Sequence, residues 1–294
     1  VGSLVGNSAL LPKTGIEALD VEGVPITMAI VPGISDQDVQ NALIALAERT
    51  SDFIAVIGTP LAVGNAQKAV DWHNGKHLRT TAINSSYAAI YYPSVKVFNP
   101  YLGRDIFMDP GIYGIKQMCY TDSVSDPWFA PAGFIRGRLL KPTEVEVDLS
   151  QGERDSLYSG GNAINPIVNF PQRGITIFGQ RTAQRDPTAL DRINVRRLLL
   201  VVKRVILEAT QRFVFEPNDE ITWEKVKATL EPFLDDIQRR RGITQFKVVC
   251  DETTNTPVRV DRNELWCKVL IKPTKTAEVI VFELNITNQS TNLS

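Results

Sequence analysis

The sequence predicts an α/β fold, a mostly parallel sheet with helical crossovers, followed by a C-terminal mixed α+β domain. Three observations lead to this prediction. The chain has 294 residues, which corresponds to roughly two domains of about 150 residues each. In the first half, short apolar runs alternate with helical periodicity, as in parallel sheets covered by helices on both faces. In the second half, two long amphipathic helices precede apolar runs expected to form a sheet that is buried on at least one side.

The first half contains three apolar runs that we expect to be strands, at residues 26–31, 53–57 and 88–92. The turn signal Pro32-Gly33 closes the first run, and Ser35 or Asp36 can then cap a helix over residues 37–49. A second helix is expected over residues 65–74. Helical connections of this kind between parallel strands should be right-handed.

The middle of the chain is less regular. Residues 93–125 are rich in proline, glycine and aromatic residues, so we expect loops with one helix near residues 111–120. A strand over residues 145–149 and a short helix over residues 151–159 should follow. The glycine pair at residues 160 and 161 is the best boundary candidate, which divides the chain into domains 1–160 and 161–294.

The second half has a strand over residues 174–179 and two long helices, over 191–212 and 222–241, each with apolar residues at helical spacing. Pro232 lies inside the second helix and is expected to kink or split it. Strands are expected near residues 246–250, 265–272 and 278–286.

Composition excludes several classes of protein. Lys and Arg total 32 against 33 for Asp and Glu, so no overall basic field attracts nucleic acid or an anionic membrane. The sequence contains no run of 18 apolar residues, which is about the length needed to span a membrane. The three cysteines have no CxxC spacing and are interpreted as reduced, mostly buried thiols of a protein folded in the cytosol. The chain opens on Val1-Gly2 rather than on Met, so we expect a trimmed or processed product.

The sequence contains two weak signals for catalytic chemistry. His73 and His77 have the i, i+4 spacing of helical zinc ligands, but Asn74-Gly75 between them favours a polar helix end. The Pro32-Gly33 turn lies between a predicted strand and a predicted helix, the position that phosphate-binding loops occupy. It lacks the GxGxxG pattern and the Lys-Ser/Thr pair of such loops. There is no GxSxG elbow either. We therefore expect no enzyme, no cofactor and no metal, and a nucleotide-binding α/β enzyme remains the alternative.

A basic run, Arg239-Arg240-Arg241, ends the last predicted helix, and Lys225 and Lys227 precede it on the same helix. Positive side chains in a last helical turn are favoured by the helix dipole, so a solvated surface explains the run. An acidic protein partner is a second explanation. Nucleic acid is the weakest of the three, because no aromatic residues are interleaved with the arginines.

Several segments in the same order resemble the contractile tail sheath proteins of phages and related contractile injection particles. The similarity covers nearly the whole chain and is strongest from Trp128 to Pro257. Any one segment is a weak signal, whereas all six in this order are specific. They are residues 128–137, 164–174, 178–182, 193–198, 215–219 with Trp223, and 250–257.

The resemblance implies a structural subunit. Such subunits form stacked hexameric rings around a tail tube and contract to drive the tube through the host envelope. The implied partners are other copies of the chain, the tail tube protein, and the baseplate and tail terminator proteins. The implied location is the virion tail, assembled in the host cytoplasm. A sheath from a non-phage injection system is a further alternative.

The resemblance also implies two interfaces. Strands from neighbouring subunits add to the C-terminal sheet, which is therefore open to strand addition. The N-terminal arm that the family uses for this is expected to be missing here. The family also places a helix of this domain against the tube. The residues expected to add as a strand are Glu278, Val279, Ile280, Val281, Phe282 and Glu283, and those expected to face the tube are Lys225, Lys227, Arg239, Arg240 and Arg241.

Overall fold

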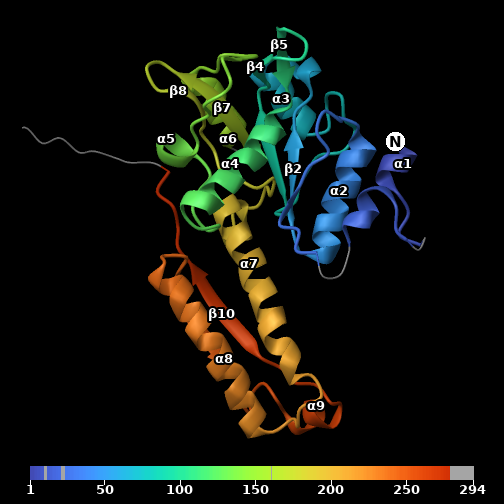
Figure 1. Cartoon of the computed structure of the whole chain (residues 1–294), viewed down its shortest axis with the longest axis vertical. Coiled ribbons are helices and arrows are strands. Elements are labelled where there is room, and N and C mark those ends of the chain that lie inside the picture. Colours follow the sequence, from blue (N-terminus) through green and yellow to red (C-terminus); the bar gives the residue numbers. More distant parts are fainter. Residues whose placement is uncertain (10–11, 21–23, 160, 279–294) are drawn as a thin grey trace, which may run out of the picture.

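The structure, a computed structural model, describes residues 1–9, 12–20, 24–159 and 161–278. It has a mixed α/β fold, as predicted at that level. Figure 1 shows an elongated molecule with a large α/β unit at one end. From this unit, helix α7 (Ile193–Thr210) leads to a C-terminal unit that contains α8 (Glu220–Arg239), β9 (Ile243–Val249), α9 (Pro257–Asp261) and β10 (Lys268–Pro273).

The α/β unit is built on a five-stranded sheet of order β1-β2-β3-β7-β8. The strands are β1 (Met28–Ala29), β2 (Ile54–Gly58), β3 (Ala88–Tyr92), β7 (Ile164–Phe170) and β8 (Gly174–Ile177). The first four run parallel, and β8 pairs antiparallel with β7. Every residue of β2 and β3 is buried, which explains why both appear in the sequence as unbroken apolar runs.

Helices cover both faces of this sheet. One face packs against α2 (Gln37–Thr50), α3 (Ala66–His73) and α6 (Gln151–Tyr158), and the other against α4 (Pro110–Val124) and the start of α7. The Asp36 side chain accepts hydrogen bonds from the first-turn amides of α2, as expected of a cap. Gly114 lets α4 approach β3, because a Cβ there would lie 2.4 Å from the Tyr91 ring.

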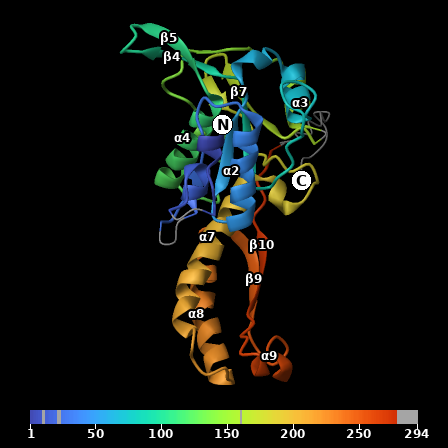
Figure 2. The same ribbon diagram turned by 90° about the vertical axis from the view of Figure 1, so that its right-hand side faces the viewer.

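The region predicted as loops between residues 93 and 125 also contains two strands, so that prediction was incomplete. Strands β4 (Val95–Asn99), β5 (Arg104–Met108) and β6 (Glu144–Val145) form a separate antiparallel sheet of order β5-β4-β6. Figure 2 shows the β4–β5 hairpin projecting from the α/β unit. β5 is largely exposed, and in β4 buried Val95 and Val97 alternate with less buried residues, so neither strand has the unbroken apolar run by which strands were recognised. The strand predicted over residues 145–149 is shortened to its first residue.

Short elements complete the chain. They are the helices α1 (Gly2–Val5) and α5 (Gly133–Arg136) and the 3₁₀ turns Gly15–Leu19, Leu61–Val63, Ala189–Asp191 and Gln211–Phe213.

Two expectations concerned the effect of Pro232 on its helix and the position of the domain boundary. Pro232 does not split α8, which runs over 20 residues as one helix. Its position on the exposed side lets the carbonyl of the preceding turn reach water, which lowers the cost of the missing hydrogen bond. The division at residues 160 and 161 stays a prediction. Strands β7 and β8 follow that point in the sequence and yet belong to the same sheet as β1–β3.

Within the described residues, none of the helices combines the length and apolar character needed to cross a membrane.

Candidate assembly interface

The C-terminal unit has a hydrophobic core of its own, formed by two helices and two strands. The apolar face of α8 contributes Val226, Leu230 and Leu234, and α7 contributes Leu198 and Val202. One face of the β9–β10 sheet closes this core through buried Val248 and partly buried residues of both strands. Figures 1 and 2 show the sheet running alongside α8.

This sheet has only two strands in the described part of the chain. β9 and β10 pair antiparallel, from Lys268 opposite Val249 to Ile271 opposite Phe246 and beyond. Each strand therefore has one edge with no partner strand among the described residues. The alternation along β10 is regular, with every second residue exposed, including Leu270 at 45 %. Unpaired strand edges of this kind are templates for another strand.

Among the residues predicted for strand addition, Glu278 alone lies within the described residues. It lies outside β10, and its carboxylate binds Arg192 through two hydrogen bonds, of 2.7 Å to Nε and 2.9 Å to a terminal nitrogen. The Tyr158 hydroxyl donates to the same carboxylate at 3.0 Å, and Gln180 donates at 3.3 Å. These contacts attach the segment after β10 to the α/β unit. The other five predicted residues, 279–283, lie outside the described residues.

The charges around Glu278 support this attachment. Burial is the largest single influence and opposes the charged form of Arg192, but Glu278, Tyr158 and Asp191 together outweigh it, and the pKa of Arg192 is raised. Burial, together with the same carboxylate, raises the pKa of Tyr158, so its hydroxyl remains a proton donor at neutral pH.

The basic residues predicted to face a tube fall into two groups. Arg239, Arg240 and Arg241 lie at the C-terminal end of α8, and Lys225 and Lys227 lie near its start. Lys227 and Arg239 are 12 positions apart on the helix, a distance of about 18 Å at 1.5 Å per residue. The helix also has five acidic side chains against three basic ones, so it does not present a uniformly positive surface.

Arg240 is bound within the molecule. It pairs with Asp126 and, at 3.5 Å, with Asp236, and its guanidinium lies 5.1 Å from the Trp128 ring. The indole nitrogen of Trp128 donates to the Arg240 carbonyl at 3.1 Å. These contacts attach the end of α8 to the segment that follows α4.

The other members of the set differ in exposure. Arg239 is exposed and pairs with Asp235 at 3.3 Å, and Arg241 is exposed with a left-handed φ of 66°. Lys225 is exposed, whereas Lys227 is partly buried beside Glu224 at 3.8 Å.

A second basic set, on α7, fixes the long helix to the α/β unit. Arg197 pairs with Asp122 at 2.6 Å, and Lys203 donates to the Thr50 carbonyl at 2.6 Å, at the C-terminal end of α2. The guanidinium of Arg196 lies 3.8 Å from the Tyr87 ring and donates to the Ser86 carbonyl. Sequence reasoning did not find this role, because the partners of Arg197 and Lys203 are 75 and 153 positions away.

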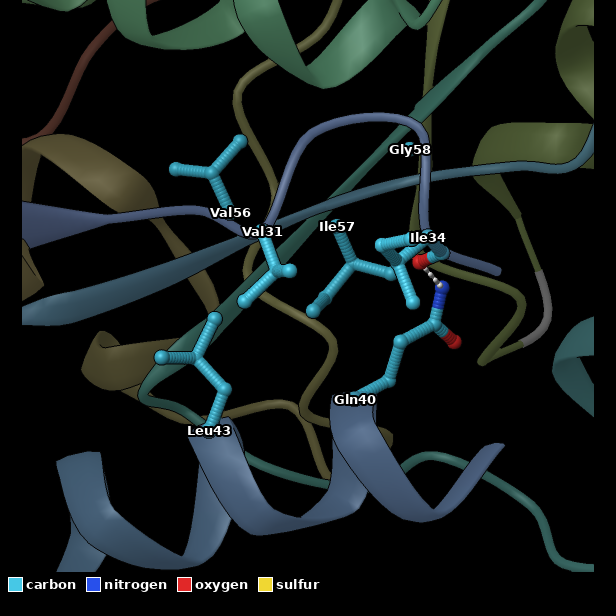
Figure 3. Close-up of a pocket in the computed structure, with 7 residues that line it drawn as sticks. All are labelled: Val31, Ile34, Gln40, Leu43, Val56, Ile57 and Gly58. Carbon is cyan, nitrogen blue, oxygen red and sulfur yellow. Dashed lines mark hydrogen bonds between the residues drawn. The ribbon is translucent and has the colours of Figure 1, made fainter. Parts of the chain in front are cut away.

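The Pro32-Gly33 turn, the basis of the nucleotide alternative, is already occupied by a side chain of the protein. The Gly33 amide donates to the Asp109 carboxylate at 2.8 Å, so a negative charge stands where a phosphate would bind. Figure 3 shows the adjoining cavity, lined mainly by apolar side chains from α2 and β2, with Gln40 hydrogen-bonded to the Ile34 carbonyl. Its volume of about 10 Å³ is at the lower limit for one water molecule.

His73 and His77 do not lie on one helical face. Helix α3 ends at His73, and Gly75 follows with a left-handed φ of 74°. His73 is completely buried, and burial with the nearby charges of Arg185 and Arg79 lowers its pKa to about 4. Across the described part of the chain, no three His, Cys, Asp or Glu side chains come together in a metal-binding arrangement.

Comparison with known sequences gives the following matches. Residues 185–287 match the family of the phage tail sheath C-terminal domain. The tail sheath protein of Vibrio phage KVP40 is 37% identical over 236 residues, covering 79% of this chain and 34% of that protein. The tail sheath protein of Enterobacteria phage T4 is 33% identical over 232 residues, covering 76% of this chain and 34% of that protein. The chain spans about a third of the length of these relatives.

Solved structures show the same fold. The sheath complex of an extracellular contractile injection system, PVC, in its contracted state has a TM-score of 0.75 at 22% identity, covering 92% of this chain and 75% of that one. A chain of the anti-feeding prophage baseplate has a TM-score of 0.71 at 22% identity, covering 89% of this chain and 68% of that one. The sequence and fold agree, and the chain belongs to the tail sheath protein family.

Proposed function

We propose that this chain forms part of a structural subunit of a contractile sheath. The subunit would assemble with copies of itself as stacked hexameric rings around a tail tube and contract to drive the tube through the host envelope. The observation that carries the proposal is the two-stranded β9–β10 sheet, whose outer edges have no partner strand among the described residues. A subunit that works through contacts with its own copies needs such edges and needs no catalytic set.

The proposed contact between copies is strand addition. The segment from Glu278 to Glu283 of one copy would pair with a free edge of β9 or β10 in another. The attachment of Glu278 to Arg192 supports this, because it would fix the point from which the following residues reach another copy. Backbone hydrogen bonds would provide the affinity, and the exposed side chains of the edge would set the register.

The proposed tube contact uses the exposed members of the basic set on α8. Arg239 and Arg241 would face acidic groups of the tube, together with Lys225 and, less directly, Lys227. Arg240 has partners within the subunit, so its part in this contact would be to hold the end of the helix in place. Exposed ion pairs are each worth only about 0–1 kcal/mol, and such contacts can be exchanged when a sheath moves along its tube.

The likeness to tail sheath proteins supports a wider proposal about partners and setting. We propose contacts with the tube, baseplate and tail terminator proteins in a virion tail assembled in the host cytoplasm. No enzymatic step is included, and contraction would draw on energy stored in subunit packing. A sheath of a non-phage injection system is the second candidate, favoured by the structural likeness to the PVC and anti-feeding prophage assemblies.

The strand-addition proposal is tested with Leu270→Pro, which introduces into β10 a residue that disfavours strand pairing. Leu270→Thr is the matched control, because it retains strand propensity at the same exposed position. The protein, in the length in which its host expresses it, is co-produced with its tube protein and examined by electron microscopy. We expect sheathed tubes with Leu270→Thr and bare tubes with Leu270→Pro, with unchanged circular dichroism. Normal sheaths with both variants would contradict strand addition at this edge.

The tube contact is tested separately with the double variant Arg239→Glu and Arg241→Glu, which leaves Arg240 in place. The matched control is Lys275→Glu, a charge reversal on the segment after β10. We expect fewer sheathed tubes with the double variant and no change with the control. An unchanged fraction of sheathed tubes with the double variant would remove these residues from the tube contact.

A further inference from the structure

Two of the three cysteines lie opposite one another at the loop end of the β9–β10 hairpin. The strand register places Val249 opposite Lys268, so the next residues, Cys250 and Cys267, are opposite each other where the ladder ends. Residues directly opposite in an antiparallel pair have Cα atoms about 4.5–5.5 Å apart. A disulfide requires a Cα separation of about 4.4–6.8 Å, so the backbone geometry already suits one.

The two thiols also interact. The neighbouring Cys267 thiol is the main reason why the pKa of Cys250 is lowered, and Cys250 in turn raises the pKa of Cys267. The Asn255 side chain adds a donor 3.9 Å from the same sulfur. The partner thiol thus favours the thiolate of Cys250, the form that reacts with disulfides.

The loop between the two cysteines is closed by hydrogen bonds beside them. Asn255 donates to the Trp266 carbonyl at 3.1 Å and accepts from the Trp266 amide at 2.6 Å. It also donates to the Asp251 carbonyl at 3.2 Å. These bonds hold together the same two chain segments that carry the cysteines, so a covalent link there would add little strain.

We propose that Cys250 and Cys267 form a reversible intrachain disulfide when the protein meets a small disulfide oxidant such as oxidised glutathione. One thiolate attacks the glutathione disulfide, whose S–S bond breaks and releases one glutathione thiolate. The second cysteine then attacks the mixed disulfide and releases the other glutathione. Two protein thiols are oxidised, one glutathione disulfide is reduced, and the two protons pass to the released glutathione thiolates.

The link would fasten β9 to β10 and close the loop that contains α9. The third cysteine, Cys119, is exposed on α4 in the α/β unit and takes no part. The thiols would remain reduced in the cytosol and become oxidised in an oxidising environment. This inference concerns the chemistry of one subunit and stands independently of the proposed assembly.

The test treats the folded, reduced protein with oxidised glutathione and then alkylates the remaining thiols. Trypsin separates the two cysteines, because it cuts after Lys247, Arg259, Arg262 and Lys268. We expect peptide 248–259 linked to peptide 263–268, a mass loss of about 2 Da for the protein, and a single thiol left to alkylate. The oxidised protein should also unfold about 5 °C higher, since the link restrains the unfolded loop.

Two variants make the assignment specific. Cys119→Ser should give the same linked peptides and the same thermal shift. Cys250→Ser should give no intrachain link and no shift. Recovery of the two wild-type peptides unlinked after oxidation, or links formed only through Cys119 between molecules, would overturn the proposal.

Discussion

The central sheet of the α/β unit and the β9–β10 sheet of the C-terminal unit differ in how completely their strands are covered. Strands β2 and β3 have neighbours on both edges and helices on both faces, and all their residues are buried. β10 has one neighbour, and every second residue is exposed. The first sheet can be stable without other subunits, whereas the second keeps edges that another chain can use.

The largest expected effect separates the two sheets by stability. Ile90→Ala removes a completely buried side chain from β3 and should lower the free energy of unfolding by about 2–5 kcal/mol. Leu270→Ala in β10, where the side chain is 45 % exposed, should cost less than about 1 kcal/mol. Urea unfolding of both variants measures the difference. Equal losses would mean that the two sheets are not as different as their burial indicates.

Acid should also act mainly on the α/β unit. The pKa of His73 is about 4 in the folded protein against about 6.5 when unfolded, so between these values the unfolded chain binds the proton. Stability conferred by neutral His73 is therefore fully present above pH 6.5 and is lost as the pH falls toward 4, by about 3 kcal/mol.

The check is urea unfolding at pH 7 and pH 5 for the wild type and for His73→Leu. The variant should lose less stability between these two pH values than the wild type does. An identical loss in both proteins would show that other groups cause the acid sensitivity.

A smaller effect is expected at the contact between the two units. Asp126→Ala removes the carboxylate that pairs with Arg240 and should lower the free energy of unfolding by about 1 kcal/mol. Asp235→Ala, which removes the exposed partner of Arg239, is the control and should cost less than about 0.5 kcal/mol. If thermal unfolding ranked the two variants in the opposite order, the Arg240 contacts would not be what holds the end of α8.

The sequence could predict those parts of the fold in which the pattern of apolar residues is continuous, as in a fully buried strand or an amphipathic helix. Residues 88–92 were predicted as a strand and form β3 with those bounds, and residues 37–49 form α2 with one residue more. Sequence reasoning missed β5, which is largely exposed, and β4, in which buried and less buried residues alternate. It also missed β7, because Asn165 and Pro166 interrupt its apolar run.

The candidate interface was predicted only in part, because its determinants are contacts between distant residues. The sequence showed that residues 239–241 are basic, but not that Arg240 forms an ion pair with Asp126, which is 114 positions away. For His73 and His77, in contrast, the intervening Asn74-Gly75 favoured the end of a helix over a shared metal-binding face, and α3 ends at His73. Local patterns report burial and periodicity, and they carry no information about which distant partner a charge will meet.

The most direct test of the account is amide hydrogen exchange of the C-terminal sheet in the free subunit and in the assembled sheath. Strand addition predicts that amides of residues 243–249 and 268–273 exchange more slowly by at least about tenfold after assembly, while those of β2 and β3 do not change. Exchange in β9 and β10 that is the same in free and assembled protein would contradict the claim that another copy completes this sheet.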